Sequence, residues 1–114
     1  MPLSILYEDN HLIVVEKPHG VPTQPDRSGD PDLLSLVKHH IKVRDAKPGG
    51  VYLGIVHRLD RPVGGIVVFA KTSKAAARLS AQIREGRFRK MYFAVVYGAM
   101  SPSEGTLEQW LVAA

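Results

Sequence analysis

The sequence contains no cysteine among its 114 residues. Disulfide bonds and thiolate metal ligands are therefore excluded, and we expect a cytoplasmic protein, since a reducing compartment fits this absence. Long apolar runs are also missing, because the longest, 12–15 and 65–70, are far too short to cross a bilayer. We expect no secretory signal, because the first residues lack a basic segment followed by an apolar one.

Sequence patterns for several common chemistries are missing too. No GxxxxGK[ST] or GxGxxG pattern follows an apolar stretch, so we expect no phosphate-cradling loop. No GxSxG pattern marks a nucleophilic serine. Of the five histidines, His39 and His40 are consecutive and would point to different faces of a helix, and no pair has the spacing of a metal site. We therefore expect no bound metal.

The apolar pattern predicts one α+β domain with a mixed, mostly antiparallel sheet and two flanking helices. Asp30 and Pro31 are expected to begin a helix over 31–43, and Thr72 or Ser73 to begin a second one that ends at Gly86. Strands are predicted over 4–8, 11–16, 51–56, 66–71, 90–97 and 106–112, with 66–71 in the centre of the sheet. A sheet that ended at the last of these would have an unpaired edge, so we expect a truncated sequence or self-association through that edge.

The positive charge is concentrated in one part of the chain. The formal net charge is +4, but residues 57–97 hold nine Lys and Arg against two acidic residues, a net +7, and the remainder carries −3. Such segregation indicates a basic face for a polyanion, most plausibly a nucleic acid. The alternative is a solvated helix face with charges clustered by chance, and charge alone does not separate the two.

The segment VHRLDRPVGG at 56–65 places Asp60 between Arg58 and Arg61. Nearby cations favour the ionised carboxylate even when it is partly buried, as we expect Asp60 to be. An ionised carboxylate on a basic surface can act as nucleophile or base on a nucleic acid. The alternative is that Asp60 merely caps a turn, as Asp often does shortly before proline.

Three segments resemble the RNA pseudouridine synthases of the large-ribosomal-subunit synthase A family. These are DNHLIVVEKPHGVPTQP at 9–25, HRLDRPVGGIVVFAKT at 57–72 and FRKMYFAVVYG at 88–98, in the order that the family has. The resemblance implies isomerisation of uridine in ribosomal or transfer RNA. The C1′–N1 bond breaks, the uracil turns, and it is rejoined through C5, without a cofactor or metal.

The resemblance also implies residue roles. Asp60 would be the catalytic aspartate, Tyr92 would stack on the target uracil, and Arg58 would fill the gap left by the flipped nucleotide. Lys17, Pro18 and Gly20 would shape the rim of the pocket. Gly64 departs slightly from the family, where a small hydroxyl residue often stands. Phosphate contacts would come from Arg61, Lys71, Lys74, Arg78, Arg84, Arg87, Arg89 and Lys90.

By the same resemblance, residues 1–114 would be the N-terminal part of a synthase catalytic domain, with no S4-type domain before it. The family's third motif, which pairs a basic residue with the catalytic aspartate, has no counterpart after Tyr97. We therefore keep two alternatives to an active enzyme. One is a non-catalytic RNA-binding module whose affinity does not depend on Asp60. The other is an inactive fragment that associates through its sheet edge.

Overall fold

The computed structural model describes residues 2–98 and 104–106. Its sheet has four strands in the order β1-β2-β4-β3, with bounds Ser4–Glu8 for β1, Leu12–Lys17 for β2, Gly54–Ile55 for β3 and Gly65–Ala70 for β4. All three pairings are antiparallel. The predicted α+β class with two helices is confirmed, whereas the parallel part of the expected mixed sheet does not occur within the described residues.

The central pair of the sheet is β2 with β4, in register from Leu12 opposite Ala70 to Lys17 opposite Gly65. Alternate residues of both strands face the core, where Ile13, Val15, Val67 and Phe69 are completely buried. This pattern follows from the two-residue repeat of a strand. The predicted central position of the 66–71 strand is confirmed.

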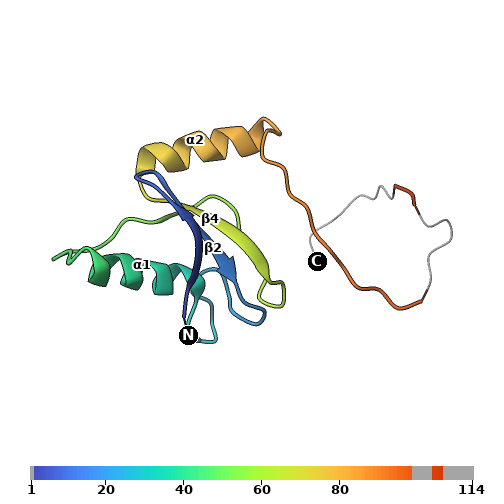
Figure 1. Cartoon of the computed structure of the whole chain (residues 1–114), viewed down its shortest axis with the longest axis horizontal. Coiled ribbons are helices and arrows are strands. Elements are labelled where there is room, and N and C mark those ends of the chain that lie inside the picture. The colour runs from blue at the N-terminus through green and yellow to red at the C-terminus, as the bar shows by residue number, and fades with distance from the viewer. Residues whose placement is uncertain (1, 99–103, 107–114) are drawn as a thin grey trace.

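Helix α1 (Leu33–Arg44) covers that core face with Leu33, Val37 and Ile41, which recur at helical spacing (Figure 1). The predicted N-cap at Asp30 is wrong, because Asp32 caps the helix and accepts from Ser35 N at 2.9 Å. The two preceding helical amides are already bonded, with Leu33 N donating to Pro22 O and Leu34 N to Thr23 O, both at 2.9 Å. The start of α1 is therefore attached to the loop after β2.

Helix α2 (Ser73–Arg84) lies on the other side of the sheet in Figure 1. Thr72 accepts from Ala75 N at 3.0 Å as predicted, and Gly86, with φ +72°, follows the last turn. A Cβ placed on Gly54 would lie 3.1 Å from the Cβ of Ala76. Glycine on β3 thus permits the helix to approach the sheet closely.

The end of the described chain differs most from the prediction. Residues 91–96 have no regular secondary structure and pair with no strand in the described part of the chain, so the strand predicted over 90–97 is not part of this sheet. Its apolar side chains are largely exposed, Phe93 at 97% and Val95 at 103%. The strand predicted over 51–56 is reduced to Gly54–Ile55. Of the strand predicted over 106–112, Thr106 is not in a strand and 107–112 lie outside the described residues.

Candidate functional site

The segment that carries Asp60 is a tight turn before β4. Val63 N donates to Asp60 O at 2.9 Å, which closes the turn, and Pro62 restricts the backbone within it. Leu59 is buried at 9% exposure, while Asp60 beside it is exposed. The turn is thus anchored through Leu59 and presents its carboxylate to solvent.

The loop after β2 holds this turn by backbone contacts. The Thr23 hydroxyl donates to Leu59 O at 2.7 Å and accepts from Leu59 N at 3.2 Å. Arg61 O accepts from Gly20 N at 2.8 Å and from the Lys17 ammonium at 3.0 Å. Gly20 adopts φ +83°, a conformation that favours glycine. Four hydrogen bonds therefore fix the backbone on both sides of Asp60.

Lys17 is the buried centre of this contact, at 1% exposure. Its ammonium also donates to Pro18 O at 3.1 Å and to Val21 O at 2.6 Å, so all three of its hydrogens have carbonyl acceptors. Burial lowers the pKa of Lys17, and the charge of Arg61 lowers it further, whereas the charge of Asp60 raises it. Lys17 therefore holds two loops together and places a positive charge beneath the Asp60 turn.

The expectation that Asp60 is partly buried between two cations is wrong. Its neighbour Arg61 turns away and binds the loop at 26–30, donating to Asp26 at 2.8 Å, Ser28 at 2.7 Å and Asp30 at 2.9 Å. The two terminal nitrogens of this guanidinium bind the two carboxylates at the same time, Nη1 that of Asp30 and Nη2 that of Asp26. Asp60 itself forms no ion pair within the described residues.

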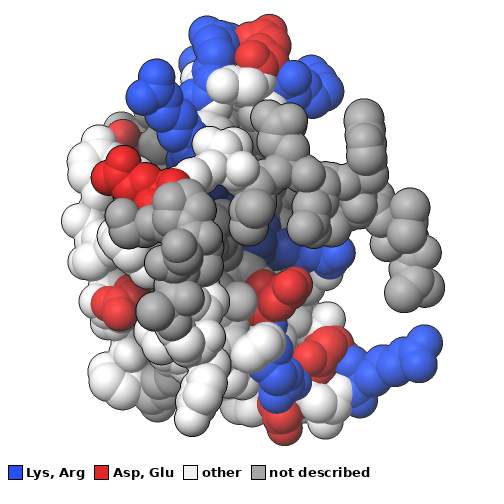
Figure 2. Space-filling view, turned by 90° about the vertical axis from the view of Figure 1, so that its right-hand side faces the viewer, with Lys and Arg blue, Asp and Glu red and all other residues white. Residues whose placement is uncertain are grey.

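The predicted phosphate-binding cations fall into two groups. Three have acidic partners: Arg61 as above, Lys71 with Glu8 at 2.6 Å, and Arg87 with Glu85. The others are exposed and form no ion pair in the described part of the chain: Lys74, Arg78, Arg84, Arg89 and Lys90. The same holds for Arg58, the residue predicted to fill the gap left by the flipped nucleotide. Figure 2 shows Lys and Arg gathered at the α2 end of one face, while the opposite end mixes both signs.

A groove of about 730 Å³ lies next to the turn. Its floor is the β4 face turned away from α1, with Ile66 and Val68, and its other side is the segment 88–93. Tyr92 lines it, at 58% exposure, and so do Leu59 and Val63 on either side of Asp60. Asp60 and Arg58 are not among the lining residues. The structure thus brings the predicted Tyr92 to the groove, with the Asp60 turn at its border.

Two histidines that sequence reasoning did not assign also line the groove. His57 Nε2 accepts from Val68 N at 3.0 Å, and its ring lies 5.1 Å from that of Phe88. Burial lowers the pKa of His57, with a smaller effect from Lys90. Because Nε2 accepts from Val68 N, the ring carries its hydrogen on Nδ1. Its place directly before Arg58 in the 57–61 motif was the signal available in the sequence.

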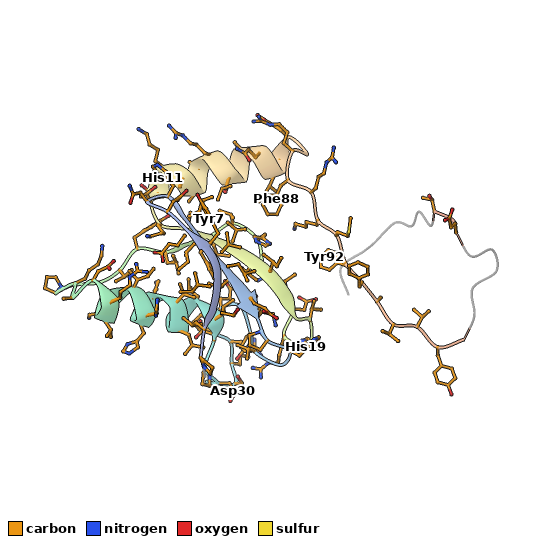
Figure 3. All side chains as sticks on the ribbon, in the orientation of Figure 1. Tyr7, His11, His19, Asp30, Phe88 and Tyr92 are labelled. Atoms are coloured by element: carbon orange, nitrogen blue, oxygen red, sulfur yellow. The ribbon has the colours of Figure 1, made fainter. Side chains whose placement is uncertain are left out.

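The second is His19, which lies at the opposite end of the groove from Phe88 (Figure 3). Its Nδ1 is 3.0 Å from Pro62 O. A Cβ on Gly64 would lie 2.9 Å from both Cδ2 and Nε2 of this ring. The absence of a side chain at Gly64, which departs from the family pattern, therefore makes room for His19.

The described residues contain no group of three or more His, Asp or Glu side chains placed to hold a metal ion. Within the same residues, no helix is long and apolar enough to cross a membrane. The chemistry that the described site offers is that of an accessible carboxylate, an aromatic ring and imidazoles beside a mostly apolar groove.

Comparison with known proteins identifies the family. The model of the RNA pseudouridylate synthase family matches residues 11–113. An uncharacterized RNA pseudouridine synthase of Synechocystis sp. is 40% identical over 111 residues, which cover 94% of this chain and 33% of that protein. Ribosomal large subunit pseudouridine synthase D of Zymomonas mobilis is 39% identical over 100 residues, with coverages of 86% and 32%. The chain thus spans about a third of the length of these curated relatives.

The fold agrees with a solved structure. Human RNA pseudouridylate synthase domain containing 4 superposes with a TM-score of 0.60 at 24% identity, over 72% of this chain and 30% of that one. At this identity the likeness concerns the fold. Together with the family match over residues 11–113, it means that this chain belongs to the RNA pseudouridylate synthase family.

Proposed function

We propose that this chain carries the uridine-isomerising centre of an RNA pseudouridine synthase, with Asp60 as its essential carboxylate. The observation that carries the proposal is the Asp60 turn itself. Four hydrogen bonds from Lys17, Gly20 and Thr23 fix its backbone, and it borders a groove lined by Tyr92. A carboxylate on a backbone held in this way, beside an apolar groove large enough to admit a base, suits chemistry on an extruded base.

The reaction breaks the C1′–N1 bond of uridine and forms a C1′–C5 bond, and the hydrogen of C5 leaves as a proton. Asp60 adds to the sugar, adds to the base or removes a proton, and each of these roles requires an ionised, accessible carboxylate. The position of Asp60 in an exposed turn makes its carboxylate accessible. Tyr92 stacks on the uracil, and Arg58 occupies the gap in the RNA stack.

RNA is the proposed partner, and ribosomal RNA is the favoured class because relatives of the chain are named ribosomal large subunit synthases. The exposed cations of α2 supply affinity for phosphate that does not depend on sequence. We further propose that the protein works in the cytoplasm. Self-association through the sheet edge expected at 106–112 stays a prediction, since residues 107–112 lie outside the described part of the chain.

The test uses ribosomal and transfer RNA transcribed with uridine tritiated at C5. The native chain and its Asp60→Asn variant are compared for release of tritium, which occurs when C5 is joined to the sugar. Asp45→Asn serves as the matched control, since Asp45 is a carboxylate at the end of α1, outside the groove.

We expect release with the native chain and the Asp45 variant and none with Asp60→Asn. Release by Asp60→Asn would contradict the assignment. If none of the three proteins releases tritium, the same three sequences are tested again with the sequence that follows residue 114 in the gene restored. If the three lengthened proteins bind RNA with equal affinity and none releases tritium, the non-catalytic RNA-binding module is favoured.

A further inference from the structure

The loop Pro18–Pro22 places an imidazole at the groove in a fixed protonation pattern. Pro62 O can only accept a hydrogen bond, so His19 Nδ1, at 3.0 Å, carries the hydrogen. The other ring nitrogen, Nε2, is then a hydrogen-bond acceptor in the neutral ring. His19 is exposed and lines the groove, so this acceptor is available to a ligand.

The backbone that carries His19 has little freedom. Lys17 bonds to the carbonyls of Pro18 and Val21, on both sides of His19, and Gly20 bonds to Arg61 O. Gly64 leaves the space in which the far side of the ring lies. The position of Nε2 is thus set by the same contacts that set the Asp60 turn.

We propose that His19 Nε2 accepts a hydrogen bond from N3–H of the bound uracil and so distinguishes uridine from cytidine. This inference rests on the proposed function. Neutral uracil carries a hydrogen on N3, whereas cytosine has a lone pair there. A neutral imidazole whose only hydrogen is held by Pro62 O pairs with the first and repels the second. Because the groove is mostly apolar, a single placed acceptor has a large influence on which base enters.

Two substitutions separate this role from a structural one. His19→Asn keeps an N–H close to the Nδ1 position, which can still donate to Pro62 O, but removes Nε2. His19→Gln places an amide oxygen near the Nε2 position and gives up the bond to Pro62 O. Gly64→Ala leaves His19 in place but displaces its ring. His39→Ala is the control, since His39 is an exposed histidine of α1 outside the groove.

The measurement is the affinity of the native protein and these variants for fluorescent single-stranded decamers of uridylate and of cytidylate. We expect the native protein and His39→Ala to prefer uridylate by about 5- to 10-fold, the effect of one hydrogen bond gained or left unmade. His19→Asn and Gly64→Ala should lose the preference, and His19→Gln should retain part of it. The proposal would be overturned if His19→Asn preferred uridylate as strongly as the native protein does. It would also be overturned if His19→Gln lost the preference while His19→Asn kept it.

The two proposals fail independently. Asp60→Asn tests the reaction through tritium release and should keep the preference for uridylate. Tritium release that persists in Asp60→Asn would contradict the catalytic assignment, whatever the His19 variants show. If tritium release depends on Asp60 but the uridylate preference is the same with and without His19, only the proposed contact of His19 with the base is contradicted.

Discussion

The hydroxyl of Thr23 bonds to both backbone groups of Leu59, as acceptor from the amide at 3.2 Å and as donor to the carbonyl at 2.7 Å. Thr23 is 3% exposed and Leu59 9%, so neither backbone group has ready access to water. One side chain thereby replaces a strand partner for the residue directly before Asp60.

Thr23→Val removes this hydroxyl and keeps the volume of the side chain. Because the amide and carbonyl of Leu59 would remain buried without partners, we expect the free energy of unfolding to fall by about 1–3 kcal/mol. Urea denaturation measures this difference, and Thr23→Ser, which keeps the hydroxyl, should lose less. Equal stability of the Val variant and the native protein would show that the two bonds contribute nothing.

Glu8 makes the free energy of unfolding depend on pH in the acidic range. Its hydrogen bonds from Arg44 and, to a smaller extent, the Lys71 ammonium lower its pKa from 4.5 to about 2. A carboxyl whose pKa is lower in the folded than in the unfolded state stabilises the fold. This stabilisation is fully present above the pKa of the unfolded state and is lost as the pH falls through the pKa of the folded state. We expect Glu8→Gln to destabilise the protein by about 1–2 kcal/mol at pH 7, a value discounted for partial solvent access.

The pH dependence of that difference is the sharper observation. It should shrink between about pH 4.5 and pH 2, because the native carboxylate then becomes neutral like the amide. Thermal unfolding of both proteins across this range measures it. A difference that does not change with pH would assign the effect to packing instead of charge.

Arg61 is predicted to hold the loop at 26–30 against the Asp60 turn. Arg61, followed by Ser28, lowers the pKa of Asp26 to about 2, which reflects how closely the guanidinium is bound. Arg61→Gln should release the loop, so that trypsin cleaves after Arg27 several-fold faster. Arg58→Gln is the control, since it also replaces an arginine, but one that forms no ion pair in the described part of the chain, and it should leave cleavage after Arg27 unchanged. Intact-mass analysis of the products measures cleavage after Arg27 in both variants.

The basic residues of α2 should determine how RNA binding depends on salt. Replacement of Lys74, Arg78 and Arg84 by Gln should reduce the slope of log K against log salt by about 2 for single-stranded RNA, if each contacts a phosphate. Lys38, Lys42 and Lys47, replaced together, give the same charge change at α1 and the loop after it, and should leave the slope unaltered. Equal slopes for both triple variants would place the RNA elsewhere.

Local pattern predicted most of the described fold. The strands at 4–8, 12–17 and 65–70 and the helix at 73–84 follow from alternation, helical spacing and the Thr72 cap. The start of α1 was misplaced, since both Asp30 and Asp32 can cap. The choice depends on amides of Leu33 and Leu34 that bond to a distant loop. High strand propensity over 90–97 did not suffice, because a strand also requires a partner.

Part of the candidate site could be predicted from the sequence, and part could not. Asp60, Tyr92 and the exposed cations of α2 could be named from the motifs and the charge pattern, but the exposure of Asp60 could not. The orientation of Arg61 could not, since it depends on Asp26 and Asp30, 35 and 31 residues away along the chain. Neither could the position of the His19 ring, which requires that residue 64 has no side chain.

The contact between the Lys17–Thr23 loop and the Asp60 turn has a kinetic consequence. Its bonds join residues 36 to 44 positions apart, and closure of such loops costs entropy that local structure does not repay. Pairing of β2 with β4 places Lys17 opposite Gly65 and so shortens the closure that remains. We therefore expect the turn to acquire its shape only together with the sheet, so that a partly folded chain exposes Asp60 without holding it in place.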